Sequence, residues 1–298
     1  MIKQTESKNE EVIMERQKVT IRQLQEKKAR KEIITMLSAY DYPLGQAMDR
    51  AGVDIVCVGD SLGMVVLGYE GTVPVTMDQM IHHCKAVTTG CKKALVVADM
   101  PFGSYNESKE QAIRNGNRFL KEGGADAVLL EGGERVADII QALVKAGIAV
   151  MGHLGVTPQT VTMQSGFKVR GTSGEEAYQI YKEAILLEEM GVFAIELECI
   201  PEKIGKEITE LVSIPTISLG AGRYCDGVFM ITYDALGLFE RFTPKFAKKY
   251  THLLDEINKA LATFADEAKG RKFPEEENVF NIKEEEYRKF LEKVKAKR

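Results

Sequence analysis

Residues 51–60 read Ala-Gly-Val-Asp-Ile-Val-Cys-Val-Gly-Asp, and this stretch carries the pattern that predicts the fold. Gly52 suits the left-handed backbone that ends a helix, because glycine has no Cβ to clash. The residues after it are apolar at consecutive positions, which is typical of a strand buried on both faces of a parallel sheet. Asp60 then stands where that strand is expected to end.

The same phrase recurs along the chain. A glycine again precedes an apolar run at residues 123–126, 146–149 and 190–193. From residue 33 onward such runs alternate with longer amphipathic segments, which predicts parallel strands joined by crossover helices. Eight runs are present, at residues 34–37, 54–58, 94–98, 127–130, 149–152, 193–197, 215–219 and 228–231. Eight parallel strands can close on themselves, so we predict an α/β fold of the (β/α)8 TIM barrel type.

The segments between the runs are predicted to be helices. Residues 76–90 begin with Thr76 as an N-cap, and residues 107–124 end in two glycines. Residues 174–191 repeat apolar side chains at helical spacing, which predicts one buried face formed by Ala177, Ile180, Ala184 and Leu187.

The ends of the chain differ from the middle in composition. Residues 10–31 are dense in charge and are expected to form an exposed helix, and further helices are expected after the barrel closes. We therefore predict an N-terminal helical extension over residues 1–30, a catalytic barrel over residues 31–270 and a charged helical tail over residues 271–298.

Composition limits the classes of partner. The formal net charge of -4 gives no general attraction to nucleic acid, and the apolar runs are far shorter than the roughly 20 residues that cross a bilayer. The polar first residues do not resemble an export signal. Five cysteines without a C-x-x-C pair indicate neither disulfides nor a zinc site. A cytoplasmic protein without nucleic-acid or membrane partners is expected.

Carboxylates follow three consecutive predicted strands. Asp60, Asp99 and Glu131 would meet at the carboxyl ends of the strands, where barrels of this type hold their active sites. Oxygen ligands suit Mg²⁺, which leaves open positions for water or substrate. Any one of them could instead cap the following helix, as Asp60 could.

Two glutamates alternate along the sixth predicted strand. Glu196 and Glu198 share a side, and Glu198 is nearer the mouth. A partly desolvated acid there is suited to act as a general base, whereas the other reading is a paired glutamate of the barrel core.

One histidine and two glycines complete the predicted mouth. His153 could donate a hydrogen bond to a substrate oxygen, or it could be a satisfied core histidine. Gly220 and Gly222 follow the seventh strand, where they could bind phosphate, make room for a flat cofactor or form a tight turn.

Longer phrases make the chain resemble a known family, ketopantoate hydroxymethyltransferase. They are VGDSLGMVVLGYEGTVPVT, IHHCKAV, VVADMPFGSY, EGGADAVLLEGG, VMGHLGVTPQTV, GFKVRG, LECIP, GAGRYCDG and FTPKFAKKY, covering roughly residues 31–252 in order. The resemblance implies a barrel of the phosphoenolpyruvate mutase and isocitrate lyase type, assembled as a homo-oligomer, generally a decamer.

The resemblance also implies roles for single residues. Asp60, Asp99 and Glu131 match the family's Mg²⁺ site, and Asp60, Ser61, Asp99 and His153 match residues around the 2-oxo acid. Glu198 matches the catalytic base. The implied substrates are 3-methyl-2-oxobutanoate and 5,10-methylenetetrahydrofolate, which together give 2-dehydropantoate in pantothenate biosynthesis.

One position departs from the family pattern. Leu129 stands where the family has a lysine, which removes a donor and a positive charge from the site. Lys168 or Arg170 would compensate if their loop folds inward. Three hypotheses remain open at this point: the family reaction, the same enolate chemistry on another 2-oxo acid, and a non-catalytic paralogue. The complete set of acids argues against the third.

Overall fold

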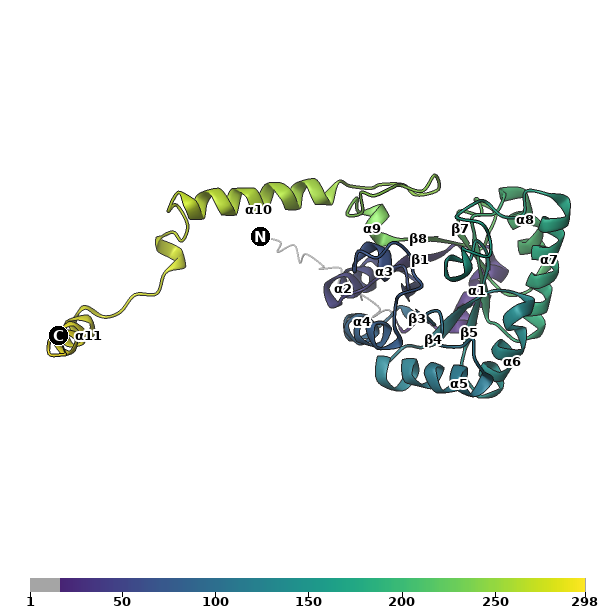
Figure 1. Cartoon of the computed structure of the whole chain (residues 1–298), viewed down its shortest axis with the longest axis horizontal. Coiled ribbons are helices and arrows are strands. Elements are labelled where there is room, and N and C mark those ends of the chain that lie inside the picture. The colour runs from purple at the N-terminus through teal and green to yellow at the C-terminus, as the bar shows by residue number, and fades with distance from the viewer. Residues whose placement is uncertain (1–16, 298) are drawn as a thin grey trace, which may run out of the picture.

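The computed structural model of the chain describes residues 17–297. Residues 1–16 of the predicted N-terminal extension, and residue 298 of the predicted tail, lie outside this range. Within it the chain forms a closed barrel with an extended C-terminal arm (Figure 1).

Eight parallel strands form the barrel in sequence order, which confirms the predicted fold class. Each predicted apolar run overlaps one of them. The strands are β1 Ile34–Ser38, β2 Ile55–Val58, β3 Leu95–Asp99, β4 Ala127–Glu131, β5 Val150–Gly155, β6 Ala194–Glu198, β7 Thr216–Leu219 and β8 Gly227–Met230. β8 pairs with β1, with Ile34 opposite Gly227, and this pairing closes the barrel.

The strands are apolar on both sides because each side faces a different core. On β4, Val128 and Leu130 belong to the core between the strands and the surrounding helices. Ala127 and Leu129 belong to a second core inside the barrel. This period of two places Glu131 on the same side as Leu129, toward the barrel axis.

Helices cover the outside of the barrel. They are α2 Tyr42–Ala51, α3 Leu62–Val65, α4 Met77–Gly90, α5 Lys109–Arg118, α6 Ala137–Lys145, α7 Gly174–Glu189, α8 Glu202–Leu211 and α9 Thr232–Ala235. A π-helical turn, Phe119–Gly123, extends α5, and 3-10 turns occupy Glu134–Val136, Pro158–Thr160 and Glu276–Asn278.

The helix signals in the sequence are confirmed. Thr76 caps α4 and accepts a hydrogen bond from the amide of Gln79. The buried residues of α7 are the predicted four: Ala177, Ile180, Ala184 and Leu187. Gly52, which precedes β2, has the left-handed backbone expected of it, with φ of 81°.

Helix α1, Ile21–Arg30, closes the amino-terminal end of the barrel. Its Leu24 is fully buried and belongs to the core inside the barrel. Lys27 Nζ lies 2.7 Å from Asp54 Oδ1, and Lys28 Nζ lies 2.8 Å from Asp226 Oδ2. The helix expected within residues 10–31 is therefore present as α1 and is largely exposed or partly exposed, but Leu24 and Ile21 pack against the inner core and two ion pairs join the helix to the barrel.

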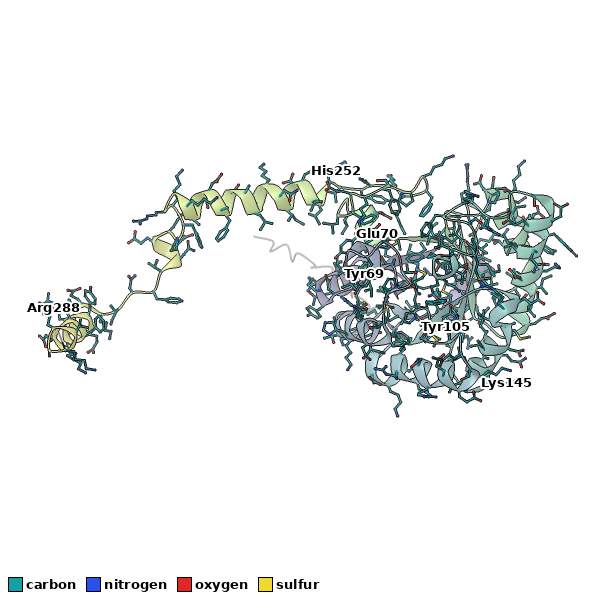
Figure 2. The ribbon with its side chains drawn as sticks, in the orientation of Figure 1. Tyr69, Glu70, Tyr105, Lys145, His252 and Arg288 are labelled. Carbon is teal, nitrogen blue, oxygen red and sulfur yellow. The ribbon has the colours of Figure 1, made fainter. Side chains whose placement is uncertain are left out.

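Helices α10, Leu253–Lys269, and α11, Glu284–Lys295, form an arm that leaves the barrel. In Figure 1 the arm projects to one side, and α11 lies at its far end. Figure 2 marks its length, with His252 at the start of α10 and Arg288 on α11. Neither helix has a buried residue. Across residues 17–297 we find no helix with the length and apolar character needed to cross a membrane.

Candidate active site

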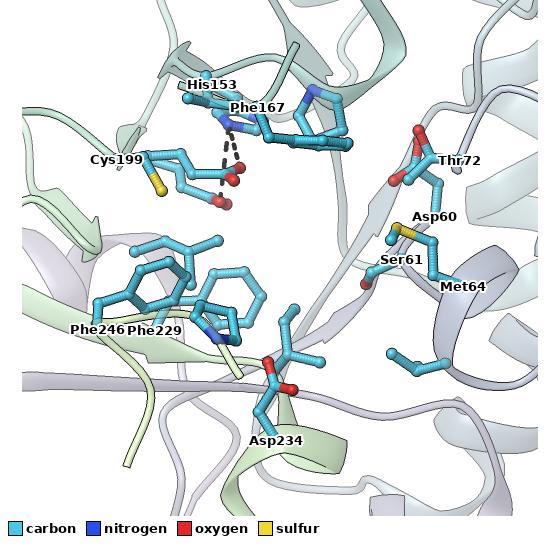
Figure 3. Close-up of a pocket in the computed structure, with 18 of the residues that line it drawn as sticks. Asp60, Ser61, Met64, Thr72, His153, Phe167, Cys199, Phe229, Asp234 and Phe246 are labelled. Carbon is cyan, nitrogen blue, oxygen red and sulfur yellow. Dashed lines mark ion pairs between the residues drawn. The ribbon is translucent and has the colours of Figure 1, made fainter. Parts of the chain in front are cut away.

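A cavity of about 500 Å³ opens at the carboxyl ends of the strands. All the residues that the sequence singled out for catalysis, metal or substrate line it: Asp60, Ser61, Asp99, Glu131, His153 and Glu198. Apolar side chains form much of the remaining wall, including Met64, Phe167, Phe229, Phe239, Phe242 and Phe246. Figure 3 shows Asp60, Ser61 and Met64 on one side of the cavity and His153 with Cys199 on the other.

Asp60 and Asp99 are joined directly. The backbone N–H of Asp60 donates to Asp99 Oδ2 at 3.0 Å. Asp99 ends β3, whereas Asp60 follows β2, so the parallel pairing of these two strands brings the two carboxylates together. Asp60 is buried, with 4% of its surface exposed.

Gln159 links Asp60 to Glu131. Its side-chain Nε2 donates to Asp60 Oδ2 at 2.9 Å, and its backbone N–H donates to Glu131 Oε2 at 3.0 Å. Its own Oε1 accepts a hydrogen bond of 2.6 Å from the hydroxyl of Tyr105. Gln159 is therefore a buried residue that hydrogen-bonds to two of the predicted metal ligands.

The sequence analysis did not identify Gln159 or Tyr105. Both stand in loops several residues beyond the end of a strand, whereas the pattern pointed only to the residue directly after each strand. A polar glutamine beside Pro158, in the loop after β5, was the available signal.

His153 faces Glu198 across the ends of neighbouring strands. His153 Nε2 lies 3.1 Å from Glu198 Oε2 and 3.9 Å from Glu196 Oε1. His153 is opposite Glu196 in the β5–β6 register, so the backbone pairing sets this contact. Glu196 is buried and Glu198 is partly exposed, and both line the cavity.

The metal-binding geometry differs from the expected one. Within residues 17–297, His153, Glu196 and Glu198 form a group whose ligand atoms all lie within 4.8 Å of one another. Asp60, Asp99 and Glu131 do not form such a group of three in the described part of the chain. They are instead connected through the Asp60 amide and through Gln159.

Burial and mutual repulsion shift the acids of the cavity in one direction. Burial raises the pKa of Asp60 to about 6, although the hydrogen bond from Gln159 opposes this. Burial also raises the pKa of Glu196 to about 7. The pKa values of Asp99 and Glu131 lie well above their usual range, because both are buried and each faces other carboxylates.

The pKa of His153 is also raised, but for a different reason. Burial lowers the pKa of His153, but the charges of Glu196, Glu198 and Glu131 outweigh burial and raise it well above its usual value. The cavity thus concentrates negative charge, and an added cation would stabilise it.

Leu129 lies inside the barrel beneath this acidic cluster. It is 2% exposed, and its register partners are Asp99 on β3 and Met151 on β5. Its side chain faces the barrel axis, as part of the core inside the barrel. The position that carries a lysine in the family pattern therefore presents an apolar side chain next to an acid.

Lys168 and Arg170, which could replace the missing family lysine, line different cavities. Lys168 lines the cavity. Arg170 forms an ion pair with Glu176 at 2.6 Å and lines a different, smaller cavity. Only Lys168 of this pair is placed to reach a ligand of the active site.

The glycines after β7 form a tight turn. Gly220 has φ of 82°, and a Cβ at this position would lie 2.7 Å from the ring of Phe246. The close approach of this aromatic wall explains why the position needs glycine.

Comparison with known sequences agrees with this arrangement. Residues 18–276 match the model of the family Ketopantoate hydroxymethyltransferase. The chain belongs to the ketopantoate hydroxymethyltransferase family. It is therefore an enzyme, a transferase of the hydroxymethyltransferase kind. The family match includes α1, the barrel and α10, but it ends before α11.

Two relatives illustrate membership of the ketopantoate hydroxymethyltransferase family. The 3-methyl-2-oxobutanoate hydroxymethyltransferase of Moorella thermoacetica is 53% identical over 266 residues, which are 89% of this chain and 99% of the relative. The protein of the same name from Heliobacterium modesticaldum is 50% identical over 268 residues, which are 90% of this chain and 97% of the relative.

Solved structures agree at the level of the fold. Phosphonopyruvate hydrolase aligns with a TM-score of 0.58 at 11% identity and covers 93% of this chain and 97% of its own. A 2,3-dimethylmalate lyase, described as a PEP mutase/isocitrate lyase superfamily member, aligns with a TM-score of 0.56 at 12% identity over 83% and 88% of the two chains. These likenesses show that the chain shares the barrel fold of those two proteins.

Proposed function

We propose that this protein transfers a hydroxymethyl group from 5,10-methylenetetrahydrofolate to 3-methyl-2-oxobutanoate in an Mg²⁺-dependent reaction that gives 2-dehydropantoate. The observation that carries the proposal is a carboxylate, Glu198, in one cavity with the acids Asp60 and Asp99. The names of the relatives at 50% and 53% identity, both 3-methyl-2-oxobutanoate hydroxymethyltransferases, support the same reaction.

The acidic side of the cavity fits Mg²⁺. Its donors are carboxylate oxygens. A hydrogen bond from Gln159 holds one oxygen of Asp60 and one of Glu131, and the second oxygen of each can serve as a ligand. Asp99 accepts from the Asp60 amide at Oδ2 and from the Cys57 thiol, 3.5 Å away, at Oδ1. Mg²⁺ commonly uses one or two carboxylates and keeps several waters, so the three acids need not all contact the ion. Burial, together with the charge of neighbouring carboxylates, raises the pKa values of Asp60 and Asp99, and a bound cation would oppose this shift.

Glu198 is the proposed general base. The carbon next to the keto group of 3-methyl-2-oxobutanoate is weakly acidic, and Glu198 accepts its proton. A bound Mg²⁺ supplies positive charge that stabilises the negative charge developing on the keto oxygen. His153, 3.1 Å from Glu198, holds that carboxylate in place and contacts the 2-oxo acid.

The folate donor and water supply the atoms of the hydroxymethyl group. The substrate carbon forms a bond to the methylene carbon, and water supplies the hydroxyl group as the two carbon–nitrogen bonds to the folate break. The proton taken from the substrate and one proton of the water end on the folate nitrogens. The aromatic wall of Phe239, Phe242 and Phe246 offers stacking surface for a flat ring such as a pterin.

A second candidate is the same proton removal on another 2-oxo acid. Leu129 favours it, because an apolar side chain beside Asp99 replaces the charge that the family pattern would supply. Lys168 on the rim is the proposed substitute if the family substrate is used.

Solvent exchange of the substrate proton tests the base. Glu198→Gln should keep the fold and lose exchange of the proton on 3-methyl-2-oxobutanoate by about 10²-fold or more, the usual scale for loss of a general base. Deuterium exchange followed by NMR, with a panel of 2-oxo acids, measures this. Glu189→Gln on the exposed surface of α7 is the matched control. Exchange close to that of the unmodified chain in Glu198→Gln would reject Glu198 as the base.

We further propose a cytoplasmic homo-oligomer, a decamer by family resemblance. Five free cysteines, four of them buried, suit a reducing compartment. Exposed apolar side chains on the arm, among them Leu261, Phe264 and Phe280, support contact with another copy of the chain.

A further inference from the structure

Three side chains on one wall of the cavity form a second cluster of metal-binding type. His153 comes from β5, and Glu196 and Glu198 come from β6. Their ligand atoms all lie within 4.8 Å of one another. Figure 3 shows this cluster across the cavity from Asp60.

The imidazole nitrogen in this cluster has no hydrogen-bond partner. His153 is 4% exposed, and its Nε2 is a buried atom for which residues 17–297 supply no hydrogen bond of acceptable geometry. Glu198 Oε2 lies 3.1 Å from this nitrogen, within ion-pair distance. Buried polar atoms are ordinarily satisfied, so an unpartnered nitrogen between two carboxylates points to a missing ligand.

The donor set favours a transition metal over Mg²⁺. Imidazole is a ligand for Zn²⁺, Co²⁺ and similar ions, whereas Mg²⁺ prefers oxygen alone. Zn²⁺ bonds of about 2.1 Å in a tetrahedron place ligand atoms roughly 3.4 Å apart. The distances of 3.1 Å and 3.9 Å from His153 Nε2 to Glu198 and Glu196 lie on either side of this value. Three protein ligands also leave a fourth position open.

We propose that His153, Glu196 and Glu198 form a second divalent-cation site that takes Zn²⁺ or a similar transition metal, separate from the Mg²⁺ site at Asp60 and Asp99. An ion held there occupies the carboxylate of Glu198 and stops it from accepting a proton, so the site inhibits the enzyme. The inhibition rests on the proposed function, whereas the binding does not.

Metal binding is tested first, without reference to activity. The full chain is saturated with Mg²⁺ and titrated with Co²⁺, which reports its ligands by visible absorption and X-ray absorption. We expect the Mg²⁺-saturated chain to bind one equivalent of Co²⁺ in addition, with an imidazole among its ligands. Asp60→Asn should retain this equivalent, whereas Glu196→Gln should weaken it by about 10-fold or more. Glu189→Gln is the control and should match the unmodified chain.

Three results would overturn the site. In the first, Co²⁺ competes with Mg²⁺ for a single binding site. In the second, the absorption spectra show no imidazole ligand. In the third, a folded Glu196→Gln variant binds Co²⁺ with unchanged affinity. If Glu196→Gln does not fold, His153→Gln takes its place, and the absorption spectrum of the unmodified chain still decides the ligand.

Inhibition is tested second, by proton exchange at saturating Mg²⁺. Zn²⁺ should abolish exchange of the substrate proton once it fills the site, whose stoichiometry the Co²⁺ titration defines. Full exchange by the Zn²⁺-loaded enzyme would overturn the inhibitory role. Imidazole-ligated Co²⁺ in a chain that transfers no hydroxymethyl group would support the site while rejecting the proposed function.

Discussion

Gln159 organises the acidic side of the active site although it carries no charge. Its amide group bridges the hydroxyl of Tyr105 and the carboxylate of Asp60, and its Nε2 also donates to the carbonyl oxygen of Met100 at 2.9 Å. Groups that orient metal ligands in this way commonly affect metal affinity nearly as much as the ligands themselves.

Gln159→Leu should weaken Mg²⁺ binding by about 10- to 100-fold, because Asp60 loses the donor that orients it. Calorimetric titration with Mg²⁺ measures the affinity, and circular dichroism checks the fold. Gln141→Leu on α6, whose Oε1 accepts a hydrogen bond from Lys145 away from the cavity, should leave the affinity unchanged. Equal affinities in the two variants would show that Gln159 does not support the metal site.

Leu129 leaves the position beneath the barrel mouth without a charge. It packs inside the barrel in register with Asp99, so a lysine here would place an ammonium group near the proposed enolate. Such a charge contributes about 2 to 4 kcal/mol, or roughly 10- to 10³-fold in rate, less the cost of burying it.

Leu129→Lys should therefore raise kcat/KM for 3-methyl-2-oxobutanoate if the chain is a weakened form of the family enzyme. An enzyme adapted to another 2-oxo acid should instead lose activity on that acid. Steady-state kinetics with both classes of substrate distinguish the two cases, and Leu129→Met controls for a change of shape without charge. No change with either substrate would remove position 129 from the site.

Among the elements, α1 has an unexpected part in stability. Leu24, with the partly buried Ile21, packs against the core at the amino-terminal end of the barrel, and Lys27 and Lys28 join the helix to Asp54 and Asp226. The rest of the helix is largely polar, which is why its charge density suggested full exposure.

Leu24→Ala should lower the free energy of unfolding by about 2–5 kcal/mol, since it leaves a cavity beneath the barrel core. Urea denaturation measures the change. Arg22→Ala on the exposed face of the same helix should change stability by about 0.5 kcal/mol or less. A small effect at Leu24 would mean that α1 detaches without disturbing the barrel.

At the scale of the whole molecule, the barrel and the arm contrast in burial. Every described residue from 271 onward is exposed, and α11 carries the apolar residues Tyr287, Phe290, Leu291 and Val294 at helical spacing. Such a stripe stabilises nothing within the single chain.

Deletion of residues 283–298 should leave the thermal midpoint of the barrel unchanged, because this segment buries no side chain in it. Differential scanning calorimetry and light scattering on the full and shortened chains check the midpoint and the assembly size together. A lower midpoint accompanied by a smaller assembly would mean that α11 packs on another copy and contributes to stability there.

The sequence by itself determined the barrel, its eight strands and the ring of acids at its mouth. These features depend on local patterns: a glycine that ends a helix, an apolar strand, and a polar residue where the strand ends. The side of β4 on which Leu129 and Glu131 lie follows equally from the period of two.

Only the tertiary structure decided how those acids are grouped. His153 meets Glu196 and Glu198 because β5 and β6 are paired in a particular register, and Asp60 meets Glu131 through Gln159 because one loop turns back over the mouth. The burial of Leu24 and the exposure of the arm are likewise set by what each helix packs against. A local pattern specifies which way a side chain points, but its distance from a partner on another loop depends on the path of both loops.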